Sequence, residues 1–262
     1  MHFYRISFAG AGRVAGALCN EFFSKGQKII QIASAGRKNG PALAGRYDSE
    51  WLNNLNFSSP VDFIIVAVPD NLLEGVLHKI KCHTDTIVVH TAGSYGLEVF
   101  PENIRYRGVF YPLQTFTAGR KISFDEVPIF LEASDSNVMA ELKELASVIT
   151  TRIYESVTEH RKMLHLAAVF ACNFTNHMLT LAKQLCRKTP YNFDVLLPLI
   201  KETVNKAIEN GPEHSQTGPA IRNDTLTIKK HLDLLSFSEE MQKIYLEITN
   251  SISDFYKTNE QL

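Results

Sequence analysis

The chain of 262 residues has little net charge, four scattered cysteines and no long apolar run. Its 27 basic and 28 acidic residues leave a formal net charge of -1, so a global attraction to nucleic acid or to an anionic membrane is not expected. No two cysteines form a C-x-x-C pair, which argues against a zinc site or a thioredoxin motif, and we expect no metal. No apolar segment reaches the ~18 residues that span a bilayer, and no signal peptide precedes the first predicted strand. These absences predict a cytoplasmic protein with free thiols and without membrane or nucleic-acid partners.

A glycine-rich turn near the N-terminus is the feature around which the chain is organised. A short run of β-formers at 4–9 leads into Gly10-Ala11-Gly12-Arg13-Val14-Ala15, and apolar residues at helical spacing follow. This strand–turn–helix pattern, in the form G-x-G-x-x-A, is typical of dinucleotide-binding folds. Gly10 permits the tight turn, Gly12 leaves room for a pyrophosphate, and Ala15 lets the helix pack closely on the strand. Alone, the motif is equally compatible with a chance turn rich in glycine and alanine. The turn residues predicted to contact the cofactor are Gly10, Ala11, Gly12, Arg13 and Val14.

The first 156 residues alternate between strand and helix patterns. The continuous apolar run at 61–68 is typical of a strand that is buried on both faces of a parallel sheet. Further strands are predicted at 28–34, 86–90, 107–111 and 127–132, with a short extended segment at 151–156. Helices are predicted at 13–24, 71–80 and 136–149, with short helical pieces at 41–46 and 49–55. The alternation predicts an α/β fold, a doubly wound and mostly parallel Rossmann sheet.

From residue 157 onward the sequence predicts helices alone. Their ranges are 159–187, 192–209, 224–235 and 238–256. We therefore expect a Rossmann dinucleotide-binding domain at 1–156 and an all-helical domain at 157–262 that contributes to substrate binding and dimerisation, with a cleft between the two. A helical domain with so much apolar face usually finds a partner, which predicts a homodimer.

The end of the second strand decides between NAD and NADP. An NAD site usually places a carboxylate there to bind the ribose hydroxyls. Here Ser34 and Ala35 are followed by Gly36, Arg37 and Lys38, and no carboxylate occurs before Asp48. A hydroxyl and two cations suit a 2′-phosphate, so Ser34, Arg37 and Lys38 predict NADP as cofactor. The alternative is a solvated Arg-Lys pair in a surface loop.

Two further strand ends lie at the carboxyl edge of the predicted sheet, outside which ligands bind. Val68 and Pro69 are predicted to line the cofactor channel with their backbone. Ser94 can reach the nicotinamide or the substrate, or it can simply be a turn residue.

Six motifs together resemble a bacterial family, described as NADP oxidoreductases, in which a Rossmann-like domain precedes a helical domain of unknown function. The motifs are residues 10–15, Val68-Pro69-Asp70, 90–94, 111–116, 165–174 and 217–224. The chain is more distantly similar to pyrroline-5-carboxylate reductase, ketopantoate reductase and the β-hydroxyacid dehydrogenases. The resemblance implies a helical domain like the C-terminal domain of 6-phosphogluconate dehydrogenase, which supplies substrate groups and often the dimer interface. In β-hydroxyacid dehydrogenases a catalytic Lys has an Asn four residues later, whereas here Lys162 is followed at that spacing by Leu166.

Three residues of the helical half are candidate catalytic groups. His165 lies in an apolar segment at 164–174 that is predicted to be buried, and a His near neutrality suits proton donation during hydride reduction. The family motif carries Asn173, which would orient the substrate or nicotinamide by hydrogen bonds. Arg222 follows the stiff turn at 217–219 and could bind a substrate carboxylate or phosphate. The alternatives are a His165 satisfied by a neighbouring helix and, around Arg222, a helix entry capped by Asp224 or Thr225.

These patterns predict an NADPH-dependent oxidoreductase that reduces a small carbonyl or imine compound in the cleft between the domains. The alternative is a non-catalytic NADP(H)-binding sensor or regulatory protein, because no complete proton relay is visible in the sequence. A third hypothesis is reduction with a deazaflavin partner.

Overall fold

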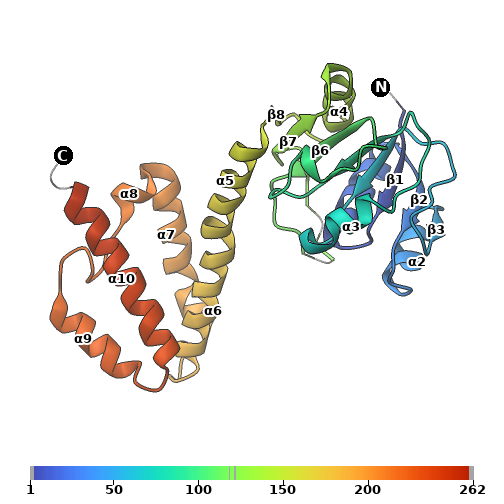
Figure 1. The fold of residues 1–262 in the computed structure, drawn as a ribbon. Helices are drawn as coiled ribbons and strands as arrows, with labels where there is room; N and C mark the ends of the chain where they lie inside the picture. Colours follow the sequence, from blue (N-terminus) through green and yellow to red (C-terminus); the bar gives the residue numbers. More distant parts are fainter. Residues whose placement is uncertain (1–2, 118, 121, 260–262) are drawn as a thin grey trace. The chain divides into compact units, whose positions relative to one another are not determined.

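The computed structural model describes residues 3–117, 119–120 and 122–259 (Figure 1). It divides into two compact units, Met1–Asn173 and Phe174–Leu262. The division falls inside the long helical segment that begins at Thr158, rather than ahead of that segment at residue 156. The functional division into 1–156 and 157–262 stays a prediction.

The described part of the first unit contains an eight-stranded sheet of order β3-β2-β1-β4-β5-β6-β7-β8. Its strands are β1 (Arg5–Ala9), β2 (Lys28–Ala33), β3 (Glu50–Leu52), β4 (Phe63–Val66), β5 (Ile87–His90), β6 (Arg107–Pro112), β7 (Ile129–Ala133) and β8 (Ile153–Glu155). Only the β6–β7 pair is antiparallel. The chain order reverses between β1 and β4, which makes the carboxyl ends of these two strands a topological switch point. The predicted doubly wound, mostly parallel sheet is confirmed.

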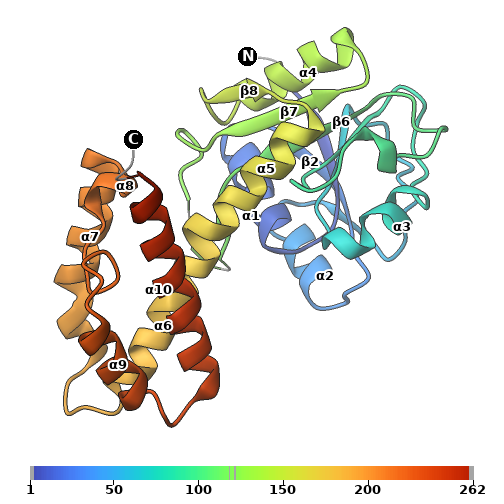
Figure 2. The same ribbon diagram turned by 60° about the vertical axis from the view of Figure 1, so that its left-hand side comes forward.

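Two apolar layers cover the faces of this sheet. The alternation of β4 shows the division, because Phe63 and Ile65 point into one layer whereas Ile64 and Val66 point into the other. The first layer is closed by α1 (Arg13–Ser24), α2 (Asn39–Ala44) and α4 (Ser136–Ser147), and the second mainly by α3 (Leu73–Leu77) and the segment 97–104 (Figure 2). All four side chains of β4 are buried, as a strand covered on both faces requires.

One predicted helix of the first unit is wrong. Within the segment 49–55 the chain forms the strand β3, which pairs in parallel with β2. This pairing aligns Gln31 with Glu50 and Ile32 with Trp51. A hydrogen bond of 2.5 Å from Gln31 Nε2 to Glu50 Oε2 joins the same two strands. The pairing with β2 overrides the local helical pattern of so short a segment. The predicted helix at 71–80 is also shorter, a 3₁₀ turn at Asp70–Leu72 followed by α3.

The predicted long helix is present, but it is less buried than expected. It comprises α5 (Thr158–Ala168), a π-helical stretch at Val169–Phe174 and α6 (Thr175–Cys186). Leu166, Phe170 and Phe174 are exposed in the single chain, so the expectation that 164–174 is buried is not met within one copy. A π-helical stretch inserts extra residues into a helix and often marks a functional position.

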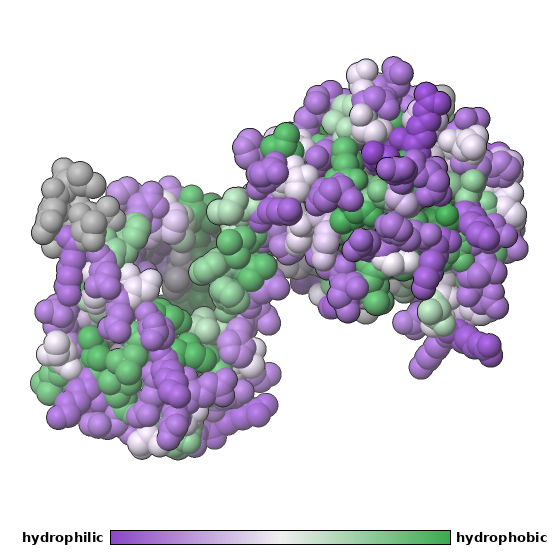
Figure 3. Space-filling model, viewed as in Figure 1, coloured by the Kyte–Doolittle hydropathy of each residue, from purple (hydrophilic) through white to green (hydrophobic). Residues whose placement is uncertain are grey.

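Among the described residues of the second unit, every regular element is a helix or a 3₁₀ turn. After α6 it contains a 3₁₀ turn at Phe193–Leu196, α7 (Leu197–Asn210), α8 (Pro212–Ser215), α9 (Thr225–Leu234) and α10 (Glu239–Asn259). Among the described residues from 174 to 257, only Ala220, Leu235 and Thr249 are buried. Large apolar side chains stay on its surface, with Ile208 77% and Leu234 74% exposed (Figure 3). This unit therefore has almost no core of its own.

No helix in the described ranges is long and apolar enough to cross a bilayer.

A buried histidine shapes the loop that follows β5. His90 Nε2 lies 3.1 Å from the carbonyl of Gly96, and the amide of Ala92 donates to Nδ1 at 3.2 Å. These partners define a neutral ring that carries its proton on Nε2. Burial lowers the pKa of His90 to about 4, and the positive charge of Arg161 acts in the same direction. The loop at the carboxyl edge is thus held by an imidazole that stays neutral.

The free energy of unfolding of the first unit should decrease as the pH falls below about 6.5. At these pH values His90 is protonated in the unfolded chain but stays neutral in the folded one. The loss should reach about 2–3 kcal/mol at pH 4.5 for a folded pKa of about 4. Urea unfolding measures it through the fluorescence of Trp51, the single tryptophan. His90→Gln should flatten this pH dependence, whereas exposed His78→Gln should not. Equal slopes for wild type and His90→Gln would contradict the assignment.

Candidate functional site

The glycine turn joins the ends of three adjacent strands. Gly10 has a φ of +117°, a region that favours glycine, and an added Cβ would collide with the carbonyl of Ala67. Its amide donates to the carbonyl of Ala33 at 2.8 Å. Only glycine can therefore lie where β1, β2 and β4 end.

Gly12 is different, because a Cβ at this position would meet no atom of the chain within 4 Å. It is the N-cap of α1, whose first amides have no partner within the helix. Space beside unpaired amides and the positive end of a helix suits a phosphate.

A pocket of about 740 Å³ extends from this turn along the carboxyl ends of β1, β2 and β4. Leu72, Val76 and Pro69 contribute apolar surface to it. Of the predicted cofactor residues, its lining contains Gly10, Ala11, Gly12, Ser34, Val68 and Pro69. Its size and its position at the switch point fit the adenosine and pyrophosphate parts of a dinucleotide.

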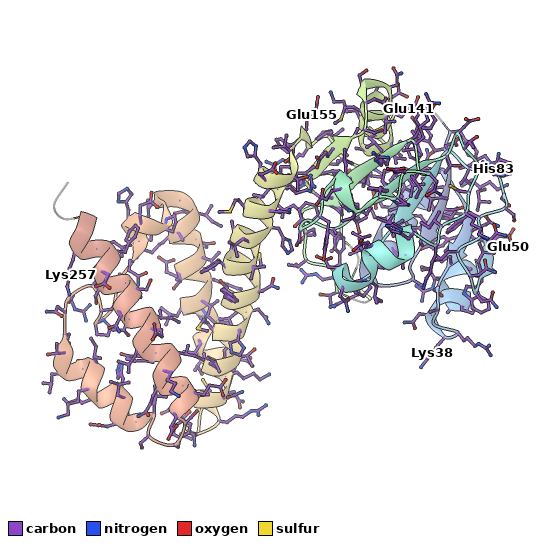
Figure 4. The ribbon with its side chains drawn as sticks, in the orientation of Figure 1. Lys38, Glu50, His83, Glu141, Glu155 and Lys257 are labelled. Atoms are coloured by element: carbon purple, nitrogen blue, oxygen red, sulfur yellow. The ribbon has the colours of Figure 1, made fainter. Side chains whose placement is uncertain are left out.

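The predicted phosphate-binding residues differ in how they meet this pocket. The hydroxyl of Ser34 donates to the carbonyl of Gly36 and accepts from Trp51 Nε1, both at 3.2 Å, so its proton is already used. Arg37 and Lys38 are exposed and do not line the pocket, and Lys38 projects away from the chain (Figure 4). The pocket lining also includes Lys79 and Lys81, which the sequence analysis missed because they follow α3, far from the expected motif.

A tyrosine–histidine pair lies at the next strand ends along the sheet. Tyr111, near the end of β6, places its Oη 2.9 Å from Nδ1 of His165 on α5. Gly93, in the loop after β5, lies against both rings, because a Cβ there would come 2.8 Å from Tyr111 Cζ and 3.0 Å from His165 Cγ. His165 is therefore partnered by a strand residue rather than by a neighbouring helix. Sequence spacing gave no sign of this pairing, since the two residues are 54 positions apart.

The surroundings keep the Tyr111 phenol protonated. Burial raises the pKa of Tyr111 to about 12, and the negative charge of Asp70 raises it further, whereas Arg161 lowers it. His165 is only partly buried, so it stays in reach of solvent. The pair thus joins a buried phenol to an imidazole that solvent can reach.

A buried ion pair holds α5 against the sheet. Arg161, which is 0% exposed, donates from Nη1 to Glu132 at 2.6 Å and from Nη2 to the carbonyl of Tyr95. Thr158 donates to the same carboxylate at 2.9 Å. Because Arg161 precedes His165 by about one helical turn, this contact fixes the position of His165 over Tyr111.

The remaining candidate residues are not part of this cluster. Ser94 is half-buried in the loop after β5. Asn173 is exposed at the end of the first unit, within the π-helical stretch. Arg222 is exposed in the second unit, before α9, where Asp224 caps the helix by accepting from the amide of Thr227 at 3.0 Å. Among the described residues, no group of three His, Cys, Asp or Glu side chains could hold a metal ion.

Comparisons with known proteins show which families the chain resembles. Residues 5–93 match a family described as NADP oxidoreductase coenzyme F420-dependent, and residues 127–252 match a domain of unknown function. The search of curated proteins gave no significant match.

Solved structures resemble nearly the whole chain. A protein from Bacteroides fragilis, described as "putative NADP oxidoreductase", is 40% identical over 96% of this chain and 98% of its own, with a TM-score of 0.88. A protein from Thermotoga maritima is 22% identical over 96% of this chain and 99% of its own, with a TM-score of 0.79. The fold of 1-pyrroline-5-carboxylate reductase from Streptococcus pyogenes is also similar, with 12% identity over 96% and 99% and a TM-score of 0.59. The chain therefore belongs to the family of NADP oxidoreductases in which a Rossmann-like domain precedes this helical domain of unknown function, and NADP is its cofactor.

Proposed function

We propose that the protein is an NADPH-dependent reductase of a small carbonyl or imine compound and that Tyr111 and His165 supply the proton. The observation that carries the proposal is the contact of 2.9 Å between Tyr111 Oη and His165 Nδ1 at the carboxyl edge of the sheet. A non-catalytic NADP(H) sensor would have no use for a solvent-linked proton donor at this position.

The strand order supports the placement of substrate beside this pair. The pocket for the adenosine half borders β2, β1 and β4, and β5 and β6 are the next strands in the same direction. A dinucleotide that lies across the switch point extends its nicotinamide toward β5 and β6, where Gly93 and Tyr111 lie. When bound, NADPH supplies the hydride.

The Tyr111 phenol donates its proton to the oxygen or nitrogen of the substrate. In the protonated state, His165 donates from Nδ1 to Tyr111 Oη, which leaves the phenol proton directed at the substrate. As that proton leaves, His165 returns one to Tyr111 and is itself recharged from solvent. Hydride and proton together complete a two-electron reduction.

The other site residues have proposed roles in binding. The amides of 10–14 face the pyrophosphate, and Val68 and Pro69 line the channel. Arg37 and Lys38 bind the 2′-phosphate. Ser34 stabilises the loop that contains them, because its hydroxyl is hydrogen-bonded to Gly36 and Trp51. Ser94 and Asn173 remain proposed contacts of the nicotinamide or the substrate, and Arg222 remains a proposed substrate contact.

A second candidate is hydride exchange between NADP and the deazaflavin coenzyme F420. It is favoured by the description of the family that matches residues 5–93, which names that coenzyme. Both candidates use the same NADP pocket, and they differ in the molecule that meets the nicotinamide.

An NADPH-oxidation screen over 2-oxo acids, cyclic imines, aldehydes and coenzyme F420 should reveal a substrate. For a carbonyl or imine, Tyr111→Phe should lower kcat by roughly 10²–10⁴-fold with unchanged NADPH affinity, because it removes the general acid alone. Tyr106→Phe is the matched control, because this tyrosine directly precedes β6 and so lies at the opposite edge of the sheet from Tyr111. Full activity of Tyr111→Phe would exclude the proton relay, and turnover of F420 alone would favour the second candidate.

NADPH should bind several-fold more tightly than NADH, because Arg37 can grip a 2′-phosphate with two hydrogen bonds. Fluorescence titration of both nucleotides measures the ratio. Arg37→Ala should erase the preference, and Arg152→Ala, at another exposed position of the same unit, should keep it. Equal wild-type affinities would rule out this phosphate site.

The protein should also be a homodimer, because the helical unit buries so few of its own side chains. Light scattering at micromolar concentration should give twice the chain mass. Dilution below the dissociation constant should then reduce helical circular dichroism, since the unit has little core to hold it together alone. A folded monomer at micromolar concentration would contradict this expectation.

A further inference from the structure

A second cavity adjoins the glycine turn and is separate from the NADP pocket. It measures about 490 Å³ and is bounded by α1, by α2 with the turn that follows it, and by described residues of the segment 117–124. Its walls share only Ala11 and Gly12 with the NADP pocket. It continues along α1 past Gly16 to Asn20, whereas the NADP pocket follows the strand ends.

Three arginines from three separate segments line this cavity. Arg13 belongs to α1, Arg46 follows α2, and Arg120 lies in the segment 117–124. The described lining contains no Asp or Glu, and none of the three guanidinium groups forms an ion pair with a described residue. Like charges gathered around one concave space without counter-charge form a site for an anion.

The uncharged part of the wall indicates an organic molecule rather than a bare ion. Ala17, Leu43, Ile122 and Phe124 contribute apolar surface, and the ring of Tyr47 is half-buried there. The amides of Asn20 and Asn39 add hydrogen-bond donors and acceptors. A volume of about 490 Å³ is within the range of small-molecule sites, roughly 300–1,000 Å³.

We propose that this cavity binds a phosphorylated small molecule beside NADP and not in its place. Arginines bind phosphate oxygens with paired hydrogen bonds, and three of them match the charge of a diphosphate or of a phosphate ester with a further acid group. The molecule contacts the Ala11-Gly12 turn, which also lines the cofactor pocket, so its binding is coupled to that of NADP. The site depends on the shared turn and not on the reductase activity.

Isothermal titration calorimetry of inorganic pyrophosphate into the NADP-saturated protein, at constant ionic strength, tests the site. Wild type should bind the probe. Arg46→Gln with Arg120→Gln should weaken pyrophosphate binding at least ~10-fold, because two charge-assisted contacts are lost, and should leave NADP affinity unchanged. Both arginines are exposed, so the variant should fold. The control removes two exposed arginines outside the cavity, Arg152→Gln with Arg187→Gln.

A titration without NADP distinguishes the two sources of phosphate. If pyrophosphate binds only in the absence of NADP, the cavity holds the cofactor's own phosphates and the proposal is overturned. Absence of binding in both states, or equal weakening by the control pair, would overturn it as well. NADP affinity measured on the same samples reports separately on the cofactor site, and NADPH turnover reports on the proposed reductase.

Discussion

The buried ion pair between Arg161 and Glu132 determines how the proposed catalytic edge is built. A charged side chain that is 0% exposed is costly unless it is paired, and here Arg161 also donates to the carbonyl of Tyr95, although its Nε has no partner among the described residues. The pair joins α5 to β7 and to the loop after β5. His165, about one turn later on α5, thereby reaches Tyr111 on β6. The contact of the two rings therefore depends on an ion pair that lies one turn earlier on α5.

Glycine at two loops lets this edge close. Gly10 lies against the carbonyl of Ala67, so β1 and β4 can end side by side, and Gly93 leaves room for the rings of Tyr111 and His165. The first glycine shapes the turn proposed to bind phosphate, and the second leaves room for the pair proposed to donate the proton. In both places the absence of a side chain brings together segments that are distant in the sequence. Small residues at the carboxyl edge of the sheet thus determine where chemistry can occur.

The sequence predicted what local pattern controls. The apolar run of β4, the turn at 10–15 and most helix ranges follow from residues that are near one another in the chain, and the structure agrees. The strand β3 was mistaken for a helix because only its pairing with β2 gives it a β conformation. Tyr111 was missed as the partner of His165 for the same reason, since a contact across 54 positions leaves no periodic trace. Burial of 164–174 was inferred from apolar composition, which cannot tell whether the covering surface comes from the same copy.

The net charge of the chain, like its apolar composition, does not show how residues are distributed in the folded molecule. A formal net charge of -1 excludes a global attraction to polyanions, and that inference is sound for the molecule as a whole. Around the glycine turn, however, the cavity linings gather Arg13, Arg46, Arg120, Lys79 and Lys81 and contain no carboxylate among their described residues. Screening limits the field of exposed charges to about 10 Å at 0.1 M salt, so a ligand at this edge senses these cations and not the distant acids that balance them. Phosphate recognition by this protein is therefore a local property of the fold, which composition alone conceals.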